Sequence, residues 1–183
     1  MARCIAAIAL AIGLALPSHL RGAEPARVVV DTSAQVLHVL RGAERLRTFD
    51  DIAIGRNGTT ADKRAGDGRT PIGQYRVLAI RESTRFHRFV WLSYPTAVEA
   101  RRAHARGDLP VAARRAIERA DDGGRPPPQD TALGGYIGIH GVGAGDPAVH
   151  EDFNWTEGCV ALTDAQIDAL LRHITVGTAV EIR

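Results

Sequence analysis

Residues 134–141 read Gly-Gly-Tyr-Ile-Gly-Ile-His-Gly and predict a β-strand that ends at His140. Side chains alternate between the two faces of a strand, so the two isoleucines share one face. Tyr136 and His140 share the other face, with a glycine between them. The isoleucine face suits a hydrophobic core. The opposite face carries little bulk, so we expect it to leave room for a ligand to approach His140.

Six further short segments, rich in β-branched and apolar residues, predict more strands. They span residues 28–30, 35–40, 47–54, 73–80, 89–93 and 178–182. Turn residues separate the first three, which indicates hairpins. The polar, glycine-rich stretch 55–71 predicts a long loop. The main body is therefore predominantly β.

Two regions have helical patterns instead. Thr163 and Gln166 form a capping box that opens a C-terminal helix over 163–173, with an apolar stripe at helical spacing. The alanine- and arginine-rich stretch 95–120 is also expected to be helical, and the proline-rich stretch 121–130 to be a linker. We interpret 95–130 as one insertion. Its arginines make either an ordinary solvated face or a basic lid over an anionic substrate.

The composition is that of one globular domain. The 183 residues are 45% hydrophobic and 24% charged, which excludes collagen, coiled coil and disorder. A net charge of +2 gives no argument for nucleic-acid binding. Of the 23 basic residues only Lys63 is a lysine, and we attach no function to that bias.

Residues 1–23 are expected to be a signal peptide. Arg3 precedes an apolar run over 5–16, which is too short to span a bilayer and fits a signal core. Cleavage after Ala23 leaves a mature domain over 24–183; an uncleaved anchor is the alternative. The domain then has one cysteine, because Cys4 leaves with the signal. A single thiol in an exported protein is more often reactive than structural.

That thiol, Cys159, is the candidate nucleophile. A free thiol has a pKa of about 8.5 and needs activation, and the imidazole of His140 could take its proton. Gly158 allows close backbone approach, so amides of Gly158 and Cys159 could point at an oxyanion. The spacing alone leaves a buried cysteine and an unrelated histidine as the alternative. No zinc or nucleotide-binding spacing is present, and we expect no metal or cofactor.

Three motifs occur in order. Ile139-His140-Gly141 is followed by Thr156-x-Gly158-Cys159-Val160, and Gly66-Asp67-x-x-Thr70-Pro71-x-Gly73-x-Tyr75 precedes both. Together with the chain end, they resemble the signature of the L,D-transpeptidase catalytic domain family, of the YkuD type. The resemblance covers residues 27–183. It implies an α+β, predominantly β fold: a β-sandwich with a helical lid insertion and a C-terminal helix.

The resemblance also implies an exported periplasmic or envelope enzyme acting on the stem peptides of peptidoglycan. Cys159 would form a thioester with the third stem residue and release D-alanine. An amine of a second stem, or an envelope lipoprotein, would then accept the acyl group. The alternative is carboxypeptidase or endopeptidase hydrolysis at the same site. A non-catalytic binding module is a third hypothesis. No nucleic acid or membrane partner is implied beyond export.

The same resemblance assigns roles to single residues. Cys159 is the nucleophile, His140 the base, and the carbonyl of Gly141 orients the imidazole. Tyr136, Thr156 and Glu157 are candidates for substrate binding, although the Thr156 hydroxyl suits a turn better than catalysis. Glu157 stands where many members have histidine. A carboxylate pointing inward would oppose an oxyanion, so we expect it to point outward or to bind a substrate amine.

Overall fold

Eight strands form one hydrogen-bonded sheet in the computed structural model, which describes residues 24–183. Across the sheet they are β3 (Glu44–Phe49), β2 (Val36–Arg41), β1 (Ala26–Asp31), β10 (Ala179–Ile182), β6 (Gly73–Ser83), β7 (His87–Leu92), β8 (Gly138–His140) and β9 (Val160–Ala161). Two short strands, β4 (Thr59–Thr60) and β5 (Thr70–Pro71), pair separately. The predicted signal peptide, 1–23, lies outside the described residues.

The sheet curls so that its two ends meet. The register shifts within β6 between Val77 and Ala79, where the long strand passes from one half of the sheet to the other. Beyond β3, Ala53 exchanges backbone hydrogen bonds with Ala161 of β9, at 3.0 and 2.7 Å. The predicted strand over 47–54 is therefore wrong at its C-terminal half: β3 ends at Phe49, and Asp51 adopts a φ of 57°.

The curled sheet encloses the core, and helix α4 (Asp164–Leu170) covers β7 and β8. Ile137 and Ile139 are buried, as their shared face predicts. The capping box of Thr163 and Gln166 is present, and the apolar stripe of α4 is buried. The helix is shorter than predicted because hydrogen-bonded turns replace its last residues.

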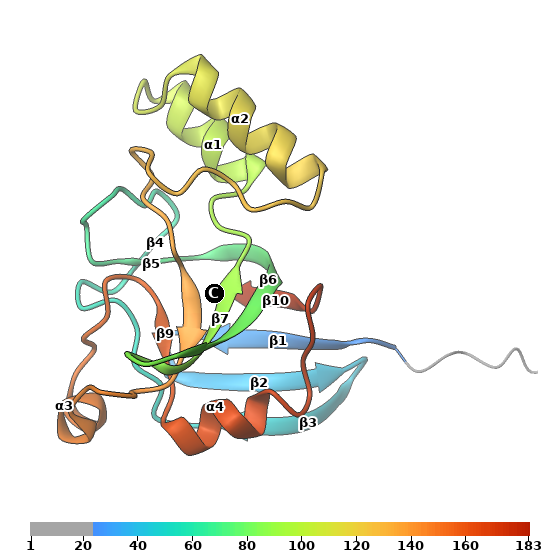
Figure 1. Ribbon diagram of the computed structural model, residues 1–183, viewed down its shortest axis with the longest axis vertical. Coiled ribbons are helices and arrows are strands. Elements are labelled where there is room, and N and C mark those ends of the chain that lie inside the picture. Colours follow the sequence, from blue (N-terminus) through green and yellow to red (C-terminus); the bar gives the residue numbers. More distant parts are fainter. Residues whose placement is uncertain (1–23) are drawn as a thin grey trace, which may run out of the picture.

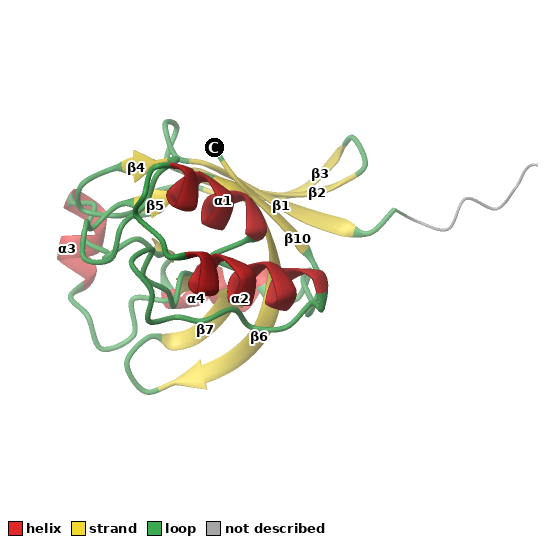
Figure 2. Cartoon of the chain, turned by 90° about the horizontal axis from the view of Figure 1, so that it is seen from above, coloured by secondary structure: helices red, strands yellow, loops and turns green. Residues whose placement is uncertain are grey.

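The insertion forms two helices, α1 (Ala97–Ala105) and α2 (Val111–Asp122), where we expected one helical stretch. Gly107, with a φ of 82°, and Pro110 at the N-cap of α2 separate them. Figures 1 and 2 show the two helices packed side by side at one end of the sheet. A short helix, α3 (Pro147–Asp152), was not predicted. Within residues 24–183, no helix has the length and apolar character needed to cross a membrane.

Candidate active site

The parallel pairing of β8 with β9 brings the two candidate catalytic residues to one face. His140 lies opposite Ala161 and Ile139 opposite Val160, so Cys159 enters the sheet beside Gly138. Because side chains alternate along both strands, Cys159 and His140 point to the same side. Both line a cleft of about 810 Å³. The 18 residues between them in the sequence contain a loop and α3.

The imidazole of His140 is held in one tautomer. Its Nδ1 lies 2.7 Å from the carbonyl oxygen of Gly141, the partner that the family resemblance implies. A carbonyl oxygen only accepts, so Nδ1 carries the hydrogen and Nε2 is unprotonated in the neutral ring. Burial lowers the pKa of His140 to about 4, against a smaller opposing effect of the Gly141 hydrogen bond. His140 is therefore a neutral base at pH 7.

Aromatic rings occupy the space that we expected to be empty beside His140. The centroid of the Phe86 ring lies 4.2 Å from that of His140, and the Trp155 ring packs edge-on at 5.6 Å. A Cβ at Gly138 would lie 2.6 Å from the Phe89 ring, which stacks parallel to the imidazole. The face is therefore not bare, because Gly138 makes room for Phe89; the expected space for a ligand beside His140 is the cleft that these rings help to line. The rings leave His140 only 1% exposed.

The thiol of Cys159 is half-buried and is protonated at rest. Its Sγ donates to the carbonyl oxygen of Tyr136 at 3.4 Å. Burial raises the pKa of the Cys159 thiol to about 11, although backbone hydrogen bonding and the charge of Lys63 act in the opposite direction. With His140 neutral as well, the site holds a thiol and an imidazole rather than a preformed ion pair.

Thr156 shapes the turn that presents the thiol. Its hydroxyl donates to the carbonyl of Cys159 at 2.7 Å and accepts from the amide of Gly158 at 3.1 Å. Gly158 has a φ of 130°, which side-chain-bearing residues rarely adopt. The Gly158 amide thus already has an acceptor. Of the two amides proposed for an oxyanion, that of Cys159 is the one we retain.

Glu157 and Tyr136, two of the candidates for substrate binding, both line the cleft. The Glu157 side chain is exposed and forms an ion pair with Arg56, consistent with the expected outward orientation. Tyr136 is not in a strand, because the predicted strand shortens to three residues and Tyr136 adopts a φ of 54°. Its ring is exposed and stacks on Trp91. Its contact with the thiol is through its carbonyl oxygen.

Helices α1 and α2 contribute no residue to the lining of this cleft, so the hypothesis of a basic lid is not supported. Two of their arginines, Arg101 and Arg114, form ion pairs with Glu118. The arginines that do line the cleft are Arg81 and Arg85, on the β6–β7 hairpin. Each lies over an aromatic ring, at 5.3 Å from the Trp91 centroid and 4.9 Å from the Phe86 centroid.

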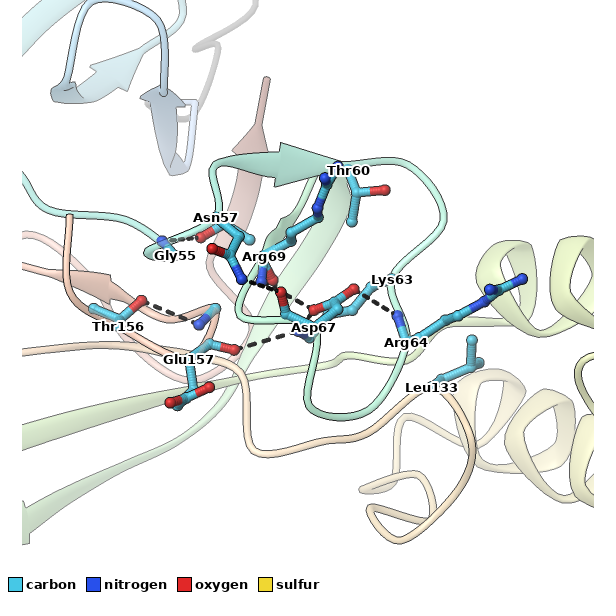
Figure 3. A network of polar contacts seen from close by, with 12 residues as sticks. Gly55, Asn57, Thr60, Lys63, Arg64, Asp67, Arg69, Leu133, Thr156 and Glu157 are labelled. Carbon is cyan, nitrogen blue, oxygen red and sulfur yellow. Dashed lines mark hydrogen bonds and ion pairs between the residues drawn. The ribbon is translucent and has the colours of Figure 1, made fainter.

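Sequence reasoning also missed Lys63. This lysine is buried in the loop between β4 and β5 and reaches the turn that precedes Cys159, as Figure 3 shows. Its uniqueness among 23 basic residues was the available signal. The aromatic residues around His140 gave no comparable signal, because their packing depends on how β7 pairs with β8. Within residues 24–183, no cluster of three or more His, Cys, Asp or Glu side chains could hold a metal ion.

Comparison with known proteins identifies the family. Residues 25–182 match the model of the L,D-transpeptidase catalytic domain, and no curated protein matches the sequence. Among solved structures, Bd1075 of Bdellovibrio bacteriovorus is similar, with a TM-score of 0.58 and 16% identity over 91% of this chain and 50% of its own.

Pgp2 of Campylobacter jejuni, the helical cell shape determining protein, has a TM-score of 0.58 and 17% identity, over 87% of this chain and 47% of its own. An L,D-transpeptidase of Xylanimonas cellulosilytica has a TM-score of 0.50 and 16% identity, over 89% of this chain and 62% of its own. The chain thus spans half to three fifths of these proteins, and at such identities the likeness concerns the fold. Since the family match extends over almost the whole described structure, the chain belongs to the L,D-transpeptidase catalytic domain family.

Proposed function

We propose that the protein transfers acyl groups between peptidoglycan stem peptides through a thioester at Cys159. The observation that carries the proposal is the shared cleft, in which a thiol and a neutral imidazole of fixed tautomer face the same side of neighbouring strands. Arg81 and Arg85 line the cleft and offer guanidinium groups to the carboxylates of a stem peptide, while Glu82 and Glu157 in the same lining balance their charge. Residues 1–23 would direct the enzyme to the cell envelope.

In this mechanism His140 moves the proton twice. As Sγ of Cys159 attacks the carbonyl carbon of the third stem residue, the thiol proton passes to Nε2 of His140. The amide of Cys159 donates to the oxyanion. Collapse breaks the peptide bond, and His140 returns the proton to the leaving nitrogen of D-alanine, leaving a thioester.

The acceptor completes the cycle. Its amine loses a proton to His140 and attacks the thioester carbon, which forms the new amide bond. Cys159 leaves as a thiolate and recovers the proton from His140. Water in place of the amine yields a free tripeptide, which is the hydrolytic alternative at the same residues.

A product assay by mass spectrometry tests the proposal. The protein and its Cys159→Ala variant are incubated separately with a disaccharide-tetrapeptide. We expect loss of D-alanine and a cross-linked dimer with the native protein alone. Tripeptide without dimer would replace transpeptidation with hydrolysis. Activity retained by Cys159→Ala would refute cysteine catalysis altogether.

The binding-module hypothesis predicts no turnover of any cell-wall peptide. Slow alkylation of Cys159 would not support this hypothesis, because burial by itself raises the thiol pKa. Turnover of the tetrapeptide, or of a cross-linked or lipoprotein-linked stem peptide, would therefore exclude it.

A further inference from the structure

The ammonium group of Lys63 is buried behind the turn that precedes Cys159. The side chain of Lys63 is 4% exposed. Its Nζ donates to Asp67 Oδ1 at 2.7 Å, to the carbonyl of Arg69 at 2.8 Å and to the carbonyl of Glu157 at 3.3 Å. An ammonium group has three hydrogens, so every donor has an acceptor. Figure 3 shows Lys63 with two of its partners, Asp67 from the β4–β5 loop and Glu157 from the turn before Cys159.

Asp67 keeps this cation in place. Its carboxylate also accepts from the amides of Arg64, at 2.8 Å, and Arg69, at 2.9 Å. Burial raises the pKa of Asp67, but the hydrogen bonds from backbone amides and from Lys63 outweigh it and hold the pKa below its ordinary value. The Asp67 carboxyl group is therefore ionised at neutral pH, and its partner Lys63 faces the turn that precedes Cys159.

Lys63 holds one end of the Glu157–Gly158 peptide bond, one residue before the nucleophile. The carbonyl of that bond, from Glu157, accepts from Lys63, and its amide, from Gly158, donates to Thr156. A Cβ at Gly158 would lie 3.0 Å from Nζ, so the ammonium packs directly against this glycine. Both ends of this peptide bond are therefore held, and the Thr156 hydroxyl also binds the carbonyl of Cys159, so contacts on both sides of Gly158 fix the turn.

We propose that Lys63 is a positioning residue for the nucleophile: it fixes the Glu157–Gly158 peptide, and its charge stabilises the negative charge that Cys159 acquires when it loses its proton. Asp67 moderates that charge. The inference deepens the proposed function and rests on it for its catalytic meaning. The charge of Lys63 does favour the thiolate, against the larger effect of burial. A scaffold role alone would require the hydrogen bonds but not the charge.

Two substitutions that change the local charge in opposite directions distinguish a role of the Lys63 charge from a purely structural role of its hydrogen bonds. Lys63→Met removes the cation. Asp67→Asn keeps the cation and removes its counter-charge; one oxygen still accepts from Lys63 and Arg69, but the side-chain NH2 replaces the acceptor of the Arg64 amide. The rate of iodoacetamide alkylation at pH 8, followed by mass spectrometry on the peptide that carries Cys159, reports the thiolate fraction. We expect Lys63→Met to slow alkylation about tenfold and Asp67→Asn to accelerate it about threefold, because a nearby unit charge shifts a pKa by about one unit.

Arg64→Met is the matched control. It removes one positive charge from the adjacent position, but the Arg64 side chain points outward to Asp108. We expect its alkylation rate to equal that of the native protein. A scaffold role predicts that both Lys63→Met and Asp67→Asn change the rate in the same direction, by loosening the turn, and that result would overturn the proposal.

Near-ultraviolet circular dichroism checks that each variant is folded. If Lys63→Met does not fold, the pH profile of alkylation of Asp67→Asn decides: a charge effect shifts the midpoint to lower pH and leaves the plateau rate unchanged, whereas a loosened turn raises the plateau rate, and that result would overturn the proposal. Alkylation needs no substrate, so its outcome is independent of the proposed function. Once turnover is established, Lys63→Met should lower kcat by at least tenfold with little change in KM; unchanged kcat would also overturn the proposal.

Discussion

Acidification should destabilise the protein through His140, well above the pH at which most carboxylates titrate. The ordinary pKa of histidine is about 6.5. Burial among aromatic rings lowers that of His140 to about 4 in the folded protein. Between these values the unfolded chain binds a proton that the folded protein does not. Stability therefore falls as the pH decreases through this window, and is fully present above it.

The two pKa values set the size of the effect. Linkage gives a loss of about 2 kcal/mol between pH 7 and pH 5, and of about 3 kcal/mol by pH 4. The side chain is almost fully buried, so solvent screening reduces the effect little. For a domain whose total stability is about 5–15 kcal/mol, this is a large fraction.

Urea unfolding at pH 7, 6 and 5, with the native protein and a His140→Asn variant, isolates this contribution. The variant differs in absolute stability, but other groups, including His150 with its lowered pKa, titrate equally in both proteins. We expect the native protein to lose about 2 kcal/mol more than the variant between pH 7 and 5. Equal losses would show that His140 is not held neutral by burial, and would refute the reasoning.

Substitutions at three positions beside Cys159 have separate expected outcomes. Gly158→Ala should lower the free energy of unfolding by about 3 kcal/mol, because φ is 130° and the new Cβ would lie 2.5 Å from the carbonyl oxygen of Arg69; an unchanged urea midpoint would contradict this. Thr156→Val leaves the Gly158 amide without an acceptor and should cost about 2 kcal/mol and lower kcat, whereas Thr156→Ser should retain both properties. Glu157→Gln removes only an exposed ion pair, so its unfolding midpoint should correspond to a change below about 1 kcal/mol.

The elements with strong local patterns could be predicted from the sequence. The capping box of Thr163 and Gln166 and the buried stripe of α4 depend on residues close in the chain. The isoleucines at 137 and 139 point into the core as their spacing requires. Motif order also identified the family, since those motifs hold their residues at fixed positions around the sheet.

Features set by tertiary pairing could not be predicted in the same way. The strand before His140 is short because Tyr136 turns out of the sheet to stack on Trp91, a residue 45 positions earlier in the printed sequence. The face opposite the isoleucines is filled by Phe86 and Phe89, which arrive from the neighbouring strand and its turn. The arginines of the insertion resembled a lid in sequence, but two of them pair with Glu118 and none lines the cleft.

Only part of the candidate site could be predicted from the sequence. The resemblance gave the thiol, the imidazole and the carbonyl of Gly141 that orients the ring. The occupied amide of Gly158 is a local contact with Thr156, in line with the turn role expected for that hydroxyl. The contacts of the buried Lys63 with the Glu157 turn depend instead on a loop 94 residues earlier in the chain. Such contacts have no sequence period, so only the folded structure reveals them.

The most direct test of cysteine acyl transfer is to observe the thioester. The native protein and Cys159→Ala are each mixed with a tetrapeptide stem, quenched in acid within the first turnover, and measured by intact mass spectrometry and peptide mapping. We expect the native protein to gain the mass of the tripeptide acyl group on the peptide that carries Cys159, in a bond that hydroxylamine cleaves, and the variant to gain nothing. Release of D-alanine by the variant, or an acyl group attached to another residue, would contradict the central claim.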